Sequence, residues 1–141
     1  GIIIGGDNDV FKMEHELIKD ELDDIFEKYP EYLKYITTSR RTPLEIDFLI
    51  DQYEFDYKLI YSKEPNINPI GDFIEICDIF YITADSTSML SEVRANTNAK
   101  LNIIDLDSKK ENTKFHRLVN IIEDMDEEKI NFAKLLKKVK I

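Results

Sequence analysis

The sequence predicts an α/β domain of three layers, with helices on both faces of a parallel sheet of about five strands. Two observations support this prediction. Short β-branched and aromatic runs alternate with longer segments of helical periodicity along the chain, a pattern typical of parallel strands joined by right-handed crossovers. The run DIFYITA at 78–84 is also nearly all apolar, as expected for a strand that is covered on both faces.

The first strand and the first helix are expected within residues 1–28. GIIIGG at 1–6 is a β-branched run that ends in two glycines, and apolar positions then recur at helical spacing over 10–28. Asp7 or Asp9 is expected to cap this helix. The apolar stripe of the helix consists of Phe11, Ile18, Leu22 and Ile25.

Residues 32–62 are expected to supply two further strands with a helix between them. YLKYITT at 32–38 and YKLIYS at 57–62 are the strands. Pro43 suits the first turn of the helix, which is expected to run to about Tyr53. The faces of this helix are marked by Leu44, Phe48 and Asp51.

The second half of the chain continues the alternation. KEPNINPIG at 63–71 is expected to be a loop because of its Pro, Asn and Gly content, and DSKKENTK at 107–114 is a polar segment of loop size. The remaining expected elements are a short helix at 70–77, strands at 78–84 and 100–106, and helices at 85–96, 112–123 and 127–140.

The composition limits the function. The chain has 141 residues and a formal net charge of −10, which fits one soluble domain and argues against nucleic acid as a partner, since that needs a basic surface. No apolar run approaches the roughly 20 residues that span a bilayer, while peripheral membrane contact stays open. The single cysteine, Cys77, excludes an internal disulfide and favours a reducing, cytoplasmic compartment.

Ligands of open α/β sheets bind outside the carboxyl ends of the strands, and three loops expected there carry suitable residues. In the first loop, Gly5 and Gly6 follow the first strand and would let the backbone approach a ligand closely. The loop matches neither GxGxxG nor a P-loop. An ordinary tight turn is an equally good interpretation of these residues alone.

The second loop, TTSRRTP at 37–43, places two adjacent arginines in an acidic chain. Arg40 and Arg41 offer the fork geometry that binds phosphate or carboxylate. Ser39 and Thr42 add hydroxyls, beside the free N–H groups at the start of the following helix. A surface pair that bridges to nearby carboxylates is an equally good interpretation of this stretch.

The third loop, TADSTSMLSE at 83–92, gathers hydroxyls and one acid, Asp85, between an apolar strand and a helix. Ser86 or Ser88 is expected to cap the helix, with Thr87 between them, and Glu92 lies about one turn further along. Together these residues offer a phosphate cradle and a carboxylate that can bind sugar hydroxyls. The alternative is a capping cluster without a ligand.

Other chemistry is poorly supported by the sequence. His15 and His116 lie on separate expected helices, and with one cysteine in the chain they make a zinc site improbable, so no metal is expected. No GxSxG motif supports a Ser-His-Asp triad. No catalytic residue is assigned.

Three motifs together resemble a known family. GGDND after the first strand, TTSRRTP after the second and TADSTSMLSE after the fourth are similar to the C-terminal domain of the mitochondrial-fission "elongated mitochondria" (ELM-like) family, in a bacterial member. The resemblance covers residues 1–125, and the second and third motifs are fairly specific as a pair. Members of the family resemble GT-B glycosyltransferases, which have two Rossmann-like domains facing a cleft.

The resemblance implies that residues 1–141 form a single Rossmann-like domain, the half of the GT-B fold that binds a nucleotide diphosphate sugar, with no cofactor and no metal. Glu92 would hold ribose hydroxyls, and Arg41 is a weaker candidate for phosphate than Arg40. The residues that would contact the diphosphate are Gly5, Gly6, Ser39, Arg40, Ser86, Thr87 and Ser88.

The resemblance also implies that this chain is half of an enzyme. The N-terminal acceptor domain is absent, and Gly1 as the first residue fits a chain cut at the domain boundary. The isolated domain is expected to be inactive, whereas the full-length protein would transfer the sugar to an unknown acceptor. After Glu92 relatives tend to have EAxxxGKPV, but Thr97 and Ala99 replace the Gly and the Pro here, which bears on activity more than on fold.

Two other interpretations stay open. A non-catalytic interaction module that kept the glycosyltransferase scaffold would bind a protein partner and no nucleotide. A response-regulator-like or other flavodoxin-type domain would need an acidic pocket at the ends of the first and third strands. Asp7 and Asp9 are available for such a pocket, but YSKEP at 61–65 fits it poorly.

Overall fold

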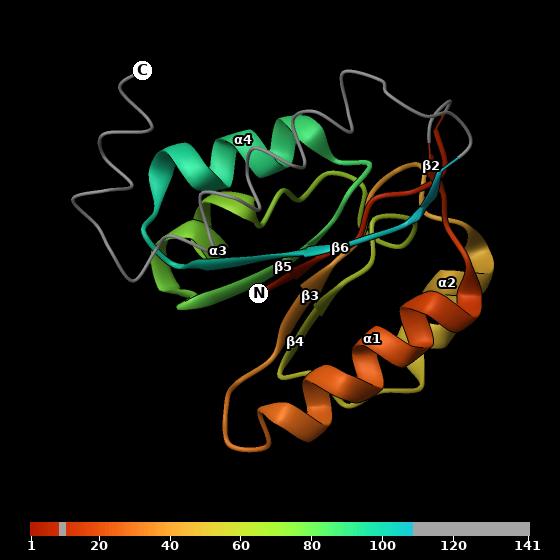
Figure 1. The fold of residues 1–141 in the computed structure, drawn as a ribbon, viewed down its shortest axis with the longest axis horizontal. Coiled ribbons are helices and arrows are strands. Elements are labelled where there is room, and N and C mark those ends of the chain that lie inside the picture. Colours follow the sequence, from red (N-terminus) through yellow and green to blue (C-terminus); the bar gives the residue numbers. More distant parts are fainter. Residues whose placement is uncertain (9–10, 109–141) are drawn as a thin grey trace.

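Five parallel strands form the central sheet of the computed structural model, which describes residues 1–8 and 11–108. Their order is β4-β3-β1-β5-β6, so successive strands lie first on one side of β1 and then on the other. The predicted α/β class, with a parallel sheet of Rossmann-like arrangement, is confirmed (Figure 1). The strands are β1 (Ile2–Ile3), β3 (Tyr35–Thr37), β4 (Tyr57–Leu59), β5 (Ile79–Thr83) and β6 (Lys100–Ile104).

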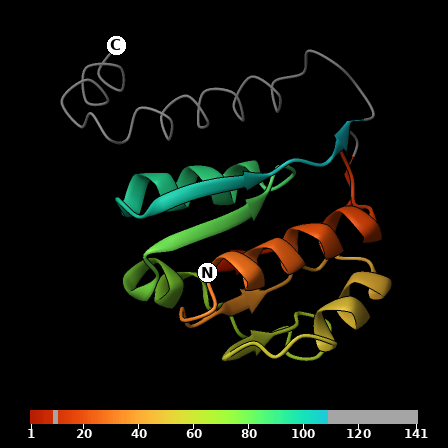
Figure 2. The same ribbon diagram turned by 60° about the horizontal axis from the view of Figure 1, so that its bottom comes forward.

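Helices cover both faces of this sheet, as predicted. Helices α1 (His15–Lys28) and α2 (Leu44–Asp51) pack on one face, and α3 (Ile70–Ile76) and α4 (Thr87–Asn96) lie on the other (Figures 1 and 2). Right-handed crossovers produce this division, because the chain reverses its direction across the sheet between β4 and β5. The reversal places β1 and β5 side by side with their following loops leading to opposite faces.

The core between the layers is built mainly from isoleucine and leucine. The predicted stripe of α1 buries Ile18, Leu22 and Ile25 against the sheet. In β5 the buried residues include Phe80 and Ile82, each 0% exposed. The short central strand β1 is therefore fixed by packing on both faces as well as by its hydrogen bonds to β3 and β5.

The beginning of the predicted helix over 10–28 is wrong. Phe11 is buried, but it lies in strand β2 (Phe11–Lys12), and the helix begins only at His15. The side chain of Asn8 accepts the Phe11 N–H at 2.7 Å and so closes a turn there. Asp7 does not cap α1, since its carboxylate accepts the N–H of Met13, and Asp9 lies outside the described residues.

The predicted faces of α2 are also wrong. Leu44 and Phe48 are each 61% exposed, and the helix ends at Asp51 instead of Tyr53. Its buried side carries Ile46, Asp47, Leu49 and Ile50, because that is the side that meets the sheet and α1. Pro43 occupies the N-cap position immediately before the helix.

Two further predictions can be compared with the structure: the loop expected at 107–114 and the N-cap of α4. Asp107–Ser108 form strand β7, which pairs antiparallel with β2, within a segment that was expected to be a loop. Ser86 holds the N-cap position of α4, but its side chain makes no capping hydrogen bond. The helices expected at 112–123 and 127–140 lie outside the described residues.

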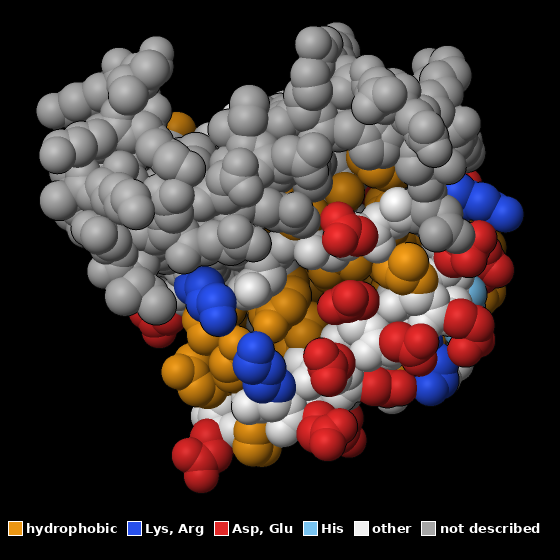
Figure 3. Space-filling model, in the orientation of Figure 1, with side chains coloured by type: hydrophobic (Ala, Val, Ile, Leu, Met, Phe, Trp, Pro, Cys, Tyr) orange, Lys and Arg blue, Asp and Glu red, His pale blue; other side chains and the backbone are white. Residues whose placement is uncertain are grey.

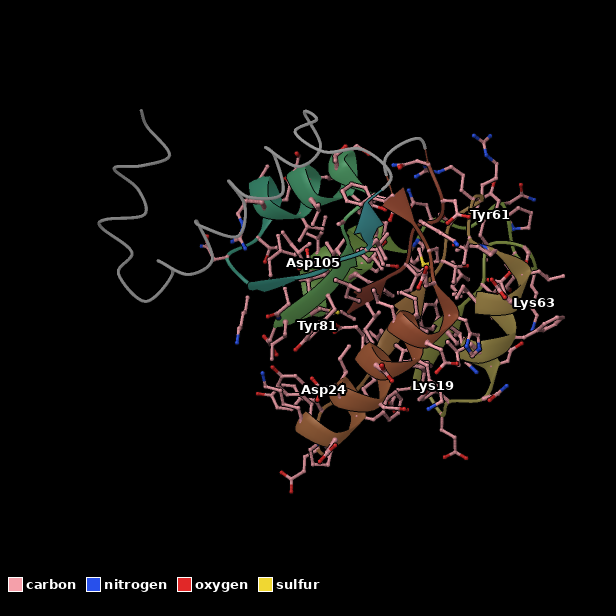
Figure 4. All side chains as sticks on the ribbon, turned by 45° about the vertical axis from the view of Figure 1, so that its right-hand side comes forward. Lys19, Asp24, Tyr61, Lys63, Tyr81 and Asp105 are labelled. Carbon is pink, nitrogen blue, oxygen red and sulfur yellow. The ribbon has the colours of Figure 1, made fainter. Side chains whose placement is uncertain are left out.

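Acidic side chains dominate the surface over α1 (Figure 3). Burial, followed by the charges of Asp24 and Asp105, raises the pKa of Glu21 in this region. Figure 4 shows Asp24 and Tyr81 on the opposite side of the molecule from Tyr61 and Lys63, which follow β4.

Within the part of the chain that the structure describes, no helix is long and apolar enough to cross a membrane.

Candidate functional site

The three loops singled out from the sequence meet at the carboxyl edge of the sheet. They follow β1, β3 and β5, which are neighbours in the sheet. The adjacent strands β1 and β5 form the point at which the strand order reverses, where open α/β sheets form their ligand crevice. The contacts between these loops decide which side chains can reach a ligand.

The two glycines of the first loop are required by close contacts with the other two loops. A Cβ at Gly5 would lie 2.1 Å from Oδ2 of Asp85, and a Cβ at Gly6 would lie 2.0 Å from the carbonyl oxygen of Arg41. The N–H of Gly5 donates to the hydroxyl of Thr83 at 2.7 Å. Gly5 therefore leaves room for the side chain of Asp85, and Gly6 lets the backbone of the second loop approach the first.

Thr42 ties the second loop to the first. Its Oγ1 donates to the carbonyl oxygen of Gly5 at 2.6 Å and accepts the N–H of Ser39 at 2.9 Å. The hydroxyl of Ser39 lies 3.2 Å from that of Thr42. Thr42 is thus engaged in holding the loops, while Ser39 and the two arginines that follow it line the open side.

Arg41 and Asp85 form the ionic contact of the site. One guanidinium nitrogen of Arg41 lies 3.3 Å from Oδ2 of Asp85, which also accepts the N–H of Gly6 at 2.9 Å. The side chain of Asp85 is fully enclosed, whereas that of Arg41 is 47% exposed. Arg41 therefore has further N–H groups available to a ligand. Arg40 is exposed and makes no ion pair with any residue that the structure describes.

Burial raises the pKa of Asp85 above its ordinary value. The N–H of Gly6, the hydroxyl of Thr83 and the charge of Arg41 oppose this rise only in part. Within the described residues, Oδ1 of Asp85 has no hydrogen-bond partner. A carboxylate that is enclosed and incompletely paired keeps a strong local field, so Asp85 affects any charged group that enters beside it.

The amino terminus of α4 supplies the third side of the site. Ser86 holds the N-cap position and Thr87 and Ser88 begin this helix of 10 residues, and the side chain of Ser86 makes no capping hydrogen bond. The first N–H groups of a helix have no partner within it, and the helix dipole adds partial positive charge at this end. The arrangement favours an anion at the start of α4.

Two hollows open at this edge and share a wall. A polar hollow of about 400 Å³ is lined by Asn8, Ser39, Arg41, Asp85, Ser86, Thr87, Ser88 and Met89. A mainly apolar hollow of about 280 Å³ lies beside it, lined by Arg40, Tyr61, the loop at 65–69 and Ile70 among others. Ser39, Ser86 and Met89 belong to both linings. The pair can hold one ligand that has a charged part and a flat apolar part.

Sequence reasoning missed part of this site. Met89, Asn8 and the loop wall at 65–69 were not among the predicted residues, although the 65–69 loop follows β4 at the same edge and the rule of carboxyl ends applies to it equally. Glu92, which was predicted, is exposed on α4 and lines neither hollow. It lies four residues after Ser88 and so shares the side of α4 that carries Ser88.

Another hollow, of about 400 Å³, lies at the opposite edge of the sheet. Its lining is aromatic and apolar, with Tyr29, Tyr35 and Tyr81 among its residues. Burial and a hydrogen bond with Tyr29 raise the pKa of Tyr81. This hollow lies away from the loops that follow β1, β3 and β5, and no loop predicted to bind a ligand contributes to it.

Across the described residues, no group of three or more His, Cys, Asp or Glu could hold a metal ion.

Comparison with protein families gives one match over nearly the whole chain. Residues 1–131 match the model of the family described as mitochondrial fission ELM1. The chain belongs to this family. The predicted resemblance is thereby confirmed at the level of the family.

Comparison with solved structures supports the fold of this ELM1 family member. The chain is similar to the peptidyl-cysteine decarboxylase EpiD, with a TM-score of 0.56 and 13% sequence identity over 89% of this chain and 80% of that one. At this identity the similarity shows the α/β fold alone. Comparison with curated proteins gives no match.

Proposed function

We propose that this chain is the donor-binding half of a GT-B-like glycosyltransferase, which binds a nucleotide diphosphate sugar at the carboxyl edge of its sheet. The observation that carries the proposal is the pair of adjoining hollows with a shared wall of Ser39, Ser86 and Met89. A nucleotide has the matching shape, since a flat base adjoins a charged diphosphate. Family membership and the strand order agree with this assignment.

The polar hollow is the place for the diphosphate. Arg41 lies on one side of it and the start of α4 on the other. Phosphate oxygens accept hydrogen bonds from backbone N–H groups at a helix start and from guanidinium groups. Ser86 and Ser88 add hydroxyls to the same wall.

The apolar hollow is the place for the nucleobase. Ile3, Ile70 and Met89 give it apolar surface, and Tyr61 adds an aromatic ring. Arg40 lines this hollow together with Ser39, which also lines the polar hollow, and the Arg40 side chain is proposed to reach the phosphates from there. Glu92 would reach a sugar hydroxyl from the neighbouring turn of α4, outside both hollows.

Transfer of the sugar would require the leaving diphosphate to be stabilised as its charge develops. The start of α4 and the arginines of the second loop can do this without a metal ion, because helix dipoles and guanidinium groups stabilise negative charge. The acceptor and a general base would come from another domain. This chain alone is therefore proposed to bind the donor without turning it over.

Isothermal titration of the 141-residue chain with UDP, ADP, UDP-glucose and ADP-glucose tests the proposal. We expect at least one of these probes to bind weakly, with a Kd on the order of 1 mM or below. Arg40→Ala should weaken that binding about tenfold or more, because it removes a charge-assisted hydrogen bond. Lys63→Ala is the matched control, since Lys63 is an exposed cation after β4 that pairs with Asp51 outside both hollows.

A second candidate function is favoured by the name of the family. The family is named for mitochondrial fission and not for a glycosyltransferase activity, so a non-catalytic interaction module on this scaffold is the alternative. Such a module would bind a protein and none of the four probes. Absence of binding by all four, with the chain folded by circular dichroism, would favour this alternative over the donor site.

A further inference from the structure

Asp85 places a negative charge inside a site proposed for a negatively charged ligand. It lines the polar hollow, and its carboxylate holds the N–H of Gly6 and one nitrogen of Arg41. These donors are of the kind that a phosphate oxygen would use. Because the side chain is fully enclosed, Asp85 cannot turn away into solvent when a ligand enters.

We propose that Asp85 sets the charge preference of this site, so that it accepts a sugar-linked diphosphate and disfavours a nucleoside triphosphate. The inference rests on the proposed nucleotide site. A sugar-linked diphosphate has both phosphates esterified and carries one charge on each. A triphosphate carries about twice that charge, because its third phosphate is a monoester with a second ionisation near neutral pH.

The charges around the polar hollow explain the preference. Arg40 and Arg41 bring two cations to the two hollows, and Asp85 offsets one of them through its contact with Arg41. The net attraction is therefore suited to a ligand of modest charge. Each additional phosphate charge gains less from Arg41 and is repelled by Asp85, and at this range one charge changes affinity by about tenfold or more.

The contacts of Asp85 suit this role better than a purely structural one. Arg41 reaches it through one nitrogen at 3.3 Å, without a bidentate pair, and Oδ1 has no hydrogen-bond partner among the described residues. An amide has nearly the same shape, and its oxygen can still accept the N–H of Gly6. Asp85→Asn therefore removes the charge while it keeps that hydrogen bond.

Asp47 provides a matched control for this substitution. It is also a buried acid, 4% exposed, with Oδ1 unpartnered within the described residues and Oδ2 accepting from Ser62. It lies on α2 and lines neither hollow. Asp47→Asn should therefore reproduce any general effect of neutralising a buried carboxylate without changing the ligand site.

The experiment measures Kd by isothermal titration at fixed ionic strength and without divalent metal, for UDP-glucose against UTP and for ADP-glucose against ATP. We expect the unaltered chain to bind the sugar diphosphate at least as tightly as the triphosphate. Asp85→Asn should tighten the binding of both ligands, and that of the triphosphate by about tenfold more, so that the ratio of the two Kd values changes about tenfold. Asp47→Asn should leave the ratio of the two Kd values unchanged.

An unchanged ratio in Asp85→Asn would overturn the inference and leave the proposed function standing. A preference of the unaltered chain for triphosphate by tenfold or more would also overturn it, and this comparison decides the matter even if Asp85→Asn does not fold. Failure of the unaltered chain to bind UDP-glucose, UTP, ADP-glucose or ATP would instead refute the proposed function, on which the inference rests.

Discussion

Replacement of Gly6 by alanine should destabilise the protein strongly, because the carboxyl edge leaves no space for a side chain there. The Cβ would lie 2.0 Å from the carbonyl oxygen of Arg41 and 2.3 Å from its carbonyl carbon. Both atoms belong to the backbone, so no rotamer change can relieve the overlap. The second loop would have to move away from the first.

The magnitude follows from two contributions. Overpacking of this kind costs about 1–3 kcal/mol. Displacement of the loop also weakens the hydrogen bond from Gly6 to the carboxylate of Asp85, which is 2.9 Å long, and a bond to a charged group contributes about 1.5–3 kcal/mol. Together they predict a loss of roughly 3–5 kcal/mol, a large part of the stability of a typical domain.

Urea unfolding followed by circular dichroism measures this loss as a change in the free energy of unfolding. Gly71→Ala is the control, because a Cβ at Gly71 would meet no atom of the described residues within 4 Å and the residue lies in α3. It should raise the free energy of unfolding by up to about 1 kcal/mol through helix propensity. A loss below about 1 kcal/mol for Gly6→Ala would refute the close contact between the two loops.

Three further predictions concern stability. Thr42→Val should lower the free energy of unfolding by about 2–3 kcal/mol in the same urea assay, because the N–H of Ser39 loses its hydroxyl partner; an unchanged midpoint would contradict this. Ile46→Ala should cost about 2–5 kcal/mol and Phe48→Ser about 0.5 kcal/mol or less, since only Ile46 is buried; equal losses would show that the faces of α2 are assigned wrongly. Burial raises the pKa of Asp85 in the folded state, so the folded chain holds this proton more tightly than the unfolded chain. The stability of the unaltered chain relative to Asp85→Asn should therefore fall as pH rises from about 4 to the raised pKa and then level off; a flat difference between the two unfolding curves across that range would contradict this.

The sequence was sufficient for the alternation of strands and helices along the chain and for three of the loops at the carboxyl ends of the strands. Both follow from local periodicity and from a general rule of open sheets. It was insufficient where distant residues decide the outcome. Phe11 has helical spacing with Ile18, but it lies in a strand because it pairs with Ser108 of the distant strand β7. Leu44 and Phe48 were expected to mark the faces of α2, whose orientation is set by docking against α1 and the sheet.

The candidate site likewise combines residues that local sequence could select with contacts that depend on the fold. Ser39, Arg41 and Ser86 line the polar hollow, and local sequence was enough to select them. The contact between Arg41 and Asp85 joins residues 44 positions apart, so it emerged only from the fold. The segment at 65–69 was predicted as a loop, but its place opposite Met89 in the lining of the apolar hollow depends on the strand order of the sheet.

Mapping of nucleotide contacts by NMR tests the central claim most directly. The 141-residue chain, labelled with ¹⁵N, would be titrated with UDP and ADP to millimolar concentration. We predict that the amide signals of Ser39, Arg40 and Ser86 shift progressively, while those of Tyr29 and Tyr81 at the opposite edge do not. Absence of shifts in the three carboxyl-edge loops, or shifts confined to the hollow around Tyr29 and Tyr81, would contradict the proposed donor site.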